Sequence, residues 1–111
     1  MTKLRSSPFG STSRTRALVA LSLLGESHAR ELPPVLGVSL TAVQRALRSL
    51  ERDGLVAARS VGRTRVYSLD PRYFARKELR AFLATLAGAD REMQSIVSGL
   101  RRRPRRTGKP G

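Results

Sequence analysis

Apolar residues recur at helical intervals near the start of the chain. Four of them keep the three- and four-residue spacing that places side chains on one face of a helix. These are Ala17, Ala20, Leu21 and Leu24. The pattern predicts a first helix over residues 13–24, with Ser11 or Ser13 as its N-cap and Gly25 at its end.

The next stretch, residues 27–36, gives conflicting signals. Ser27 could cap a helix, and Glu31 suits a first helical turn. Pro33 and Pro34, however, lack backbone N–H donors and push the residue before them away from the helical region. We therefore expect this helix to be short, bent or displaced.

The most distinctly two-faced segment follows a turn at residues 37–39. Ser39 can cap a helix over residues 40–53, and Gly54 can end it. Apolar side chains occupy one side of this helix and polar or basic side chains the other. The apolar side consists of Leu40, Val43, Leu47 and Leu50, and the opposite side of Thr41, Arg45, Arg48 and Arg52.

After Gly54 the apolar period shortens from about 3.6 to 2 residues, which predicts strands. Residues 55–58 and 65–69 form the predicted pair, and Gly62 between them suits a bend. The result is a hairpin whose tip and rising edge are basic. The basic residues are Arg59, Arg63 and Arg65.

The last patterned part of the chain predicts helix again, in two apolar stripes. One stripe is Leu79, Phe82, Leu83 and Leu86, and the other is Met93, Ile96, Val97 and Leu100. A single helix over residues 73–103 would cost only about 1 kcal/mol at the internal Gly88. Two helices, with a break at Gly88 and a new cap at Asp90, agree equally well with the pattern.

The charge of the chain points to a polyanionic partner. Its 22 Lys and Arg outnumber 8 Asp and Glu, for a formal net charge of +14 over 111 residues. Nucleic acid is the first candidate and an anionic membrane surface the second. Ten of the fourteen net charges lie in residues 1–16 and 101–111, including Arg14 and Arg16. We interpret these ends as mobile basic arms, with a flexible arm over 1–12 and a disordered tail over 101–111.

Composition also narrows the classes of site. The chain has no Cys and a single His, His28, which argues against disulfides, cysteine nucleophiles and Cys- or His-based metal sites. No apolar run reaches the roughly 18 residues of a membrane span. No nucleophile–base pair, phosphate-binding glycine loop or acid cluster with metal spacing is present. We therefore expect a cytoplasmic protein that is no enzyme and carries no cofactor.

Several short segments, taken in order, resemble the winged helix-turn-helix transcriptional regulators of the ArsR and MarR type. The segments are Ala29-Arg30-Glu31-Leu32, Leu36-Gly37-Val38-Ser39, Ala42-Val43-Gln44-Arg45-Ala46-Leu47, Leu50-Glu51-Arg52-Asp53-Gly54-Leu55-Val56 and Gly62-Arg63-Thr64-Arg65-Val66-Tyr67-Ser68-Leu69. The resemblance implies a mainly α-helical fold with a three-helix core and a small β-hairpin wing. It implies a DNA-binding domain over residues 13–70 and a C-terminal helical dimerisation segment over 71–100.

The resemblance further implies that helix 40–53 recognises bases in the major groove. Arginine bonds guanine bidentately, glutamine bonds adenine, and the free N–H groups at a helix start hold phosphate. The wing would contact the DNA backbone or the minor groove. The candidate DNA-binding residues are Ser39, Thr41, Gln44, Arg45, Arg48, Arg59, Arg63 and Arg65. The alternative for this stripe is an ordinary solvated face.

The sequence departs from the family pattern in two ways. Pro33-Pro34 stands where related domains continue the helix before the recognition helix, so the spacing of the two helices is open. Metal sensors of the ArsR type use Cys, or clusters of His and acids, whereas Asp90-Arg91-Glu92 has no His nearby. We expect no metal effector.

In ArsR-type proteins the terminal helices pair two subunits, and the seven-residue spacing here suits such a seam. The predicted interface residues are Leu79, Phe82, Leu83, Leu86, Met93, Ile96 and Leu100. The alternative is that they pack within one subunit. A two-fold dimer would set two recognition helices about one DNA turn apart.

The leading hypothesis is therefore a sequence-specific, homodimeric regulator of transcription that binds double-stranded DNA, and more specifically a repressor. The alternative is a winged-helix interaction module or accessory subunit, for example of a nucleotidyltransferase-like or toxin partner, with only non-specific affinity for nucleic acid.

Overall fold

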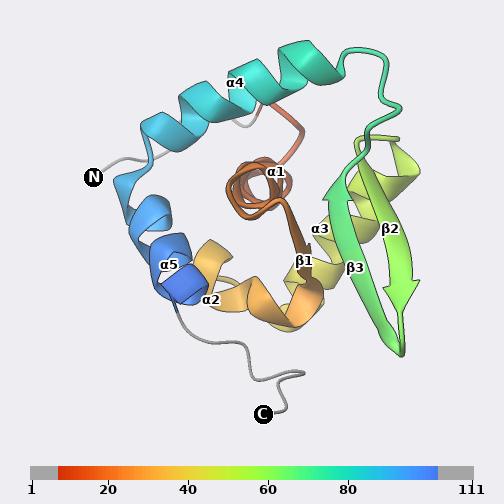
Figure 1. Ribbon diagram of the computed structural model, residues 1–111, viewed down its shortest axis with the longest axis horizontal. Helices are drawn as coiled ribbons and strands as arrows, with labels where there is room; N and C mark the ends of the chain where they lie inside the picture. Colours follow the sequence, from red (N-terminus) through yellow and green to blue (C-terminus); the bar gives the residue numbers. More distant parts are fainter. Residues whose placement is uncertain (1–7, 103–111) are drawn as a thin grey trace.

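The computed structural model describes residues 8–102 of the chain (Figure 1). The chain forms helices and a small sheet, as the sequence predicts, and the sheet contains one strand that the sequence does not predict. The helices are α1 (Thr12–Leu24), the 3₁₀ turn η1 (Ala29–Glu31), α2 (Pro33–Leu36), α3 (Leu40–Arg52), α4 (Arg76–Gly88) and α5 (Arg91–Arg102). The strands are β1 (Glu26–His28), β2 (Val56–Val61) and β3 (Thr64–Leu69).

Helix α1 lies at the centre of the molecule, with the other elements arranged around it (Figure 1). The sequence predicts a single buried face for it, but every residue from Ala17 to Leu21 is at most 1% exposed. The reason is position: α1 packs against α3, α4 and α5 on different sides, so its middle part, residues 17–21, is apolar all round.

The two prolines start a helix instead of breaking one. Pro33 and Pro34 occupy the first turn of α2, where backbone N–H groups have no partner within the helix. Gly37, with a φ of 73°, ends α2, and Val35 and Leu36 are buried. The expected short helix is therefore present as two short pieces, η1 and α2.

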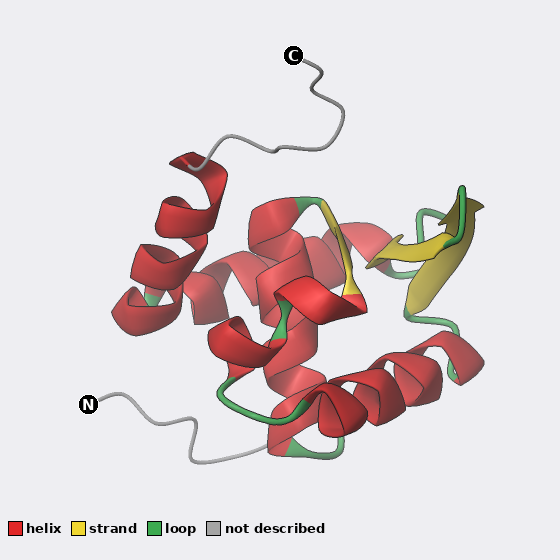
Figure 2. Ribbon diagram, turned by 90° about the horizontal axis from the view of Figure 1, so that it is seen from below, coloured by secondary structure: helices red, strands yellow, loops and turns green. Residues whose placement is uncertain are grey.

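The wing belongs to a three-stranded antiparallel sheet in the order β1-β3-β2. The pattern of the sequence did not indicate β1, which pairs Ser27 with Tyr67. The hairpin is longer than predicted, because pairing continues to Val61↔Thr64 around the turn at Gly62. In Figure 2 the hairpin extends to one side of the helical body.

The C-terminal part forms two helices, which settles the alternative left open by the sequence. Asp90 caps α5, since its side-chain Oδ1 accepts a hydrogen bond of 3.0 Å from the backbone N–H of Met93. Both helices contribute to the same hydrophobic core as α1. No helix in the described residues 8–102 is long and apolar enough to cross a membrane.

The shared core changes the interpretation of the predicted dimer seam. Leu79, Leu83 and Met93 are at most 7% exposed within the single chain, so the chain's own core already uses them. Of the other predicted interface residues, Phe82 is 43% exposed. Three are partly buried against the core: Leu86, Ile96 and Leu100.

The basic N-terminal end also needs correction. Arg14 and Arg16 lie in α1 and form ion pairs with Asp53 and Asp90, so they do not belong to a mobile arm. The predicted arm and tail otherwise fall largely on residues 1–7 and 103–111, outside the described part of the chain.

Candidate nucleic-acid interface

Helix α3 presents its basic side to solvent. Val43, Leu47 and Leu50 on its opposite side are fully buried, and they fix which way the helix faces. Ser39 caps the helix as predicted: its hydroxyl accepts a hydrogen bond of 3.1 Å from the N–H of Ala42. The exposed side carries Thr41, Arg45 and Arg48, while Gln44 is half-buried at its edge.

Arg45 and Arg48 are exposed, and neither makes a hydrogen bond or ion pair with any other residue of the described range 8–102. Their guanidinium groups keep their hydrogen-bond donors available for a partner outside the chain. The sequence predicted that both side chains face outward.

A cleft of about 350 Å³ lies between α3 and the sheet. Its lining includes four arginines and no carboxylate. The lining residues are His28, Ala29, Arg30, Gln44, Arg48, Arg63, Thr64, Arg65 and Tyr67. Four guanidinium groups around one open cleft create a local positive potential that suits a phosphate backbone.

Sequence reasoning missed Arg30 and Tyr67 in this cleft. Both positions depend on β1, which pairs with β3 and carries the chain from α1 to the edge of α3. A three-residue strand is too short for any periodicity to be recognised, so only the observed pairing of Ser27 with Tyr67 reveals them.

The wing arginines differ in their partners. Arg59 lies 2.7 Å from the carboxylate of Glu26, and Arg65 lies 2.9 Å from that of Glu51 on α3. Arg63 is exposed at the turn and has no hydrogen bond or ion pair to the other described residues. Of the three predicted wing contacts, Arg63 is therefore the one whose charge is not already engaged by a carboxylate among residues 8–102.

Arg65 bridges the wing and α3. Its guanidinium lies over the Tyr67 ring, 5.8 Å from the centroid, and also contacts Glu51. Hydrogen bonding to Tyr67, and then to Glu51, raises the pKa of Arg65 above its ordinary value. The described residues contain no group of three or more His, Cys, Asp or Glu that could hold a metal ion.

Comparison with known proteins agrees with this arrangement. Residues 12–72, from the start of α1 to just beyond β3, match the family described as the sugar-specific transcriptional regulator TrmB. The chain belongs to this family. It is a family of transcriptional regulators. Helices α4 and α5 lie beyond the matched residues of this TrmB-family chain.

Among solved structures, a mutant of ZitR from Lactococcus lactis has the same fold. The match has a TM-score of 0.60 at 18% sequence identity and covers 90% of this chain and 66% of that one. No curated protein matches the chain in sequence. The predicted winged helix-turn-helix fold is confirmed, and the narrower assignment to the ArsR or MarR type stays a prediction.

Proposed function

We propose that this TrmB-family chain is a sequence-specific repressor that inserts α3 into the major groove. The observation that carries the proposal is the pair of exposed, unengaged guanidinium groups of Arg45 and Arg48 on the outward face of α3.

Base recognition would come from one face of α3. Arg45 and Arg48 suit the O6 and N7 acceptors of guanine, and each bidentate contact is worth about 1–3 kcal/mol of discrimination. Gln44, at the edge of the cleft, suits adenine. Thr41 lies one turn nearer the start of α3 than Arg45 does, and it suits a base edge or a thymine methyl group.

Contacts to DNA phosphates would fix the position of α3 in the major groove. The N–H groups at the start of α3, beside Ser39, suit one phosphate. Arg63 at the wing turn and Arg30 in the cleft suit the adjacent backbone, because both are exposed and neither is paired with a carboxylate within residues 8–102. Such contacts contribute affinity and position without sequence preference.

We also infer that two copies pair through the C-terminal part. The exposed aromatic side chains support this: Phe82 is 43% exposed beside Phe9, and Phe74 at the approach to α4 is 92% exposed. Large apolar groups left in solvent favour association. Two-fold pairing would set the two α3 helices about 34 Å apart, one turn of DNA.

Selection of binding sites from random duplexes at a stated salt concentration tests the proposal. We expect a palindromic consensus for the wild type. Arg45→Ala and Arg48→Ala should lose preference for that consensus while keeping affinity for unrelated duplex. If both variants select the same consensus as the wild type, α3 is not the recognition element. If the wild type selects none, the chain binds DNA without sequence preference and the proposal fails.

A further inference from the structure

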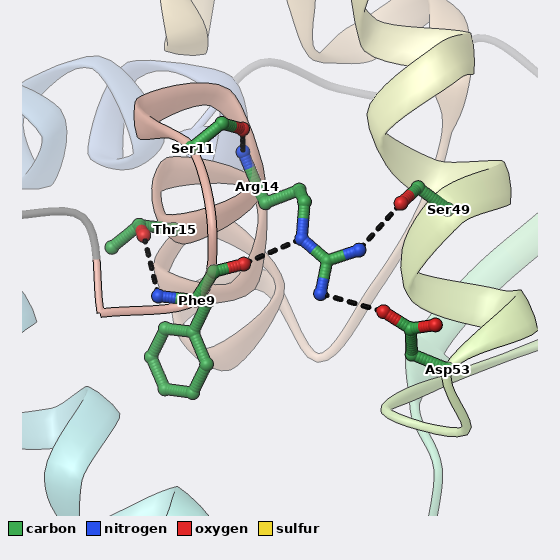
Figure 3. Close-up of polar contacts among 6 residues, drawn as sticks. All are labelled: Phe9, Ser11, Arg14, Thr15, Ser49 and Asp53. Carbon is green, nitrogen blue, oxygen red and sulfur yellow. Dashed lines mark hydrogen bonds and ion pairs between the residues drawn. The ribbon is translucent and has the colours of Figure 1, made fainter.

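Arg14 of α1 reaches across to the recognition helix, as Figure 3 shows. Its side chain is only 18% exposed, and its guanidinium makes three contacts. Nε donates to the backbone oxygen of Phe9, one terminal NH₂ group donates to the hydroxyl of Ser49, and the other lies 2.9 Å from the carboxylate of Asp53. Two of the three partners thus belong to the C-terminal turn of α3 and its cap.

The position of these contacts on α3 gives them their significance. Ser49 follows Arg45 by four residues, so the two side chains are neighbours on the same side of the helix. On the other flank of α3, Glu51 is held by Arg65 of the wing. The two contacts therefore oppose rotation of α3 about its own axis in opposite directions, and that rotation determines where Arg45 and Arg48 point.

We propose that Arg14 is a positioning residue for base recognition: it holds α3 at the rotation that directs Arg45 and Arg48 to the bases. This inference rests on the proposed function of α3. Arg14 does not touch DNA in this role. Its planar fork is required, because lysine has a single ammonium group that can satisfy the charge of Asp53 but not all three partners at once.

Arg16 offers a matched control. It lies two residues along the same helix, its side chain is 23% exposed, and it too is paired with an aspartate, Asp90, at 3.3 Å. Its other bond, of 3.2 Å, goes to the backbone oxygen of Val35 in α2. Arg16 therefore links α1 to α2 and to the start of α5, and its side-chain contacts with Asp90 and Val35 do not involve α3.

The test compares Arg14→Met with Arg16→Met, which remove the same charge from the same helix. Affinity is measured for the selected duplex and for a scrambled one, well below the melting temperature of each variant. We expect Arg14→Met to reduce the ratio of the two affinities about tenfold or more, with the affinity for scrambled duplex nearly unchanged. Arg16→Met should keep the ratio of the wild type.

Two further measurements separate positioning from a general loss of stability. Hydrogen exchange in the free protein should become faster in α3 for Arg14→Met, and in α2 and α5 for Arg16→Met. Arg14→Lys should recover part of the stability, through Asp53, but not the affinity ratio. If Arg14→Met does not fold, Ser49→Ala and Asp53→Asn each remove one contact and should each lower the ratio to a smaller degree.

Equal reductions in the ratio for Arg14→Met and Arg16→Met, or an unchanged ratio in folded Arg14→Met, would overturn the positioning role. Unchanged ratios in both Ser49→Ala and Asp53→Asn would also overturn it. In all these cases the wild type still discriminates, so the proposed function stands. A wild type that does not discriminate at all refutes both proposals.

Discussion

At the scale of single residues, the arginines of α1, α3 and the wing fall into two groups that the sequence does not distinguish. Arg14, Arg16, Arg59 and Arg65 hold carboxylates of the same chain. The outward arginines of α3 and the wing turn hold no carboxylate of the part of the chain that the structure describes. The partners lie far apart in sequence, with separations of 33 residues for Arg59 and 74 for Arg16. Local patterns of charge therefore predict that arginines are abundant and exposed, but not which of them are free.

One consequence concerns Glu51, whose carboxylate engages Arg65. Glu51→Gln should free this guanidinium for DNA and remove a negative charge from the edge of the interface. We expect higher affinity for an unrelated duplex, and a steeper salt dependence by about 0.9 in the log–log slope for one added phosphate contact. Salt titration of binding to an unrelated duplex measures both.

Glu92→Gln on the exposed face of α5 makes the same change of charge far from α3, and it serves as the control. Equal effects of the two substitutions would mean that net charge alone is responsible.

At the scale of elements, the sequence predicts those helices and strands whose own hydrophobic period is enough to identify them. Helix α3 and the hairpin have clear periods, and both were located to within a few residues. Strand β1 was missed because its three residues acquire their conformation from pairing with β3. The burial of α1 on all sides was missed because it depends on how α4 and α5 return to it.

The cap of α5 makes a prediction at this scale. Asp90→Ala removes the acceptor for the N–H of Met93 and leaves Arg16 without its carboxylate. Loss of a cap costs about 0.5–2 kcal/mol, and leaving a half-buried charge unpaired adds to that. Urea unfolding should show a lower midpoint. Asp90→Asn keeps an acceptor for the cap and should lose less. An Asp90→Ala protein as stable as the wild type would contradict the role of the cap.

The turn of the wing makes another prediction. Gly62 has a φ of +65°, a left-handed conformation that costs most other residues about 1–2 kcal/mol. Gly62→Ala should therefore destabilise the protein by about that amount, whereas Gly62→Asn should be tolerated better. Thermal unfolding distinguishes the two. Because nothing lies within 4 Å of an added Cβ, any loss comes from the backbone and not from a clash.

At the scale of the whole molecule, the proposed dimer makes a prediction about association. Phe82→Asp places a charge on the exposed aromatic pair with Phe9 and should shift the protein toward monomer in analytical ultracentrifugation. Val61→Asp, at the tip of the wing, changes an equally exposed apolar residue remote from α4 and serves as the control. A monomeric wild type, or an unchanged Phe82→Asp dimer, would contradict the proposed pairing surface.

The central position of α1 has a consequence for biosynthesis. This helix leaves the ribosome before the other described elements, yet Met93 and Val97, which belong to the core enclosing it, are among the last described residues to be made. The apolar surface of α1 therefore stays exposed until almost the whole described chain has emerged. Folding of this core is for this reason completed only after α5 has been made, and nascent chains that stop before α5 offer chaperones and proteases a hydrophobic target.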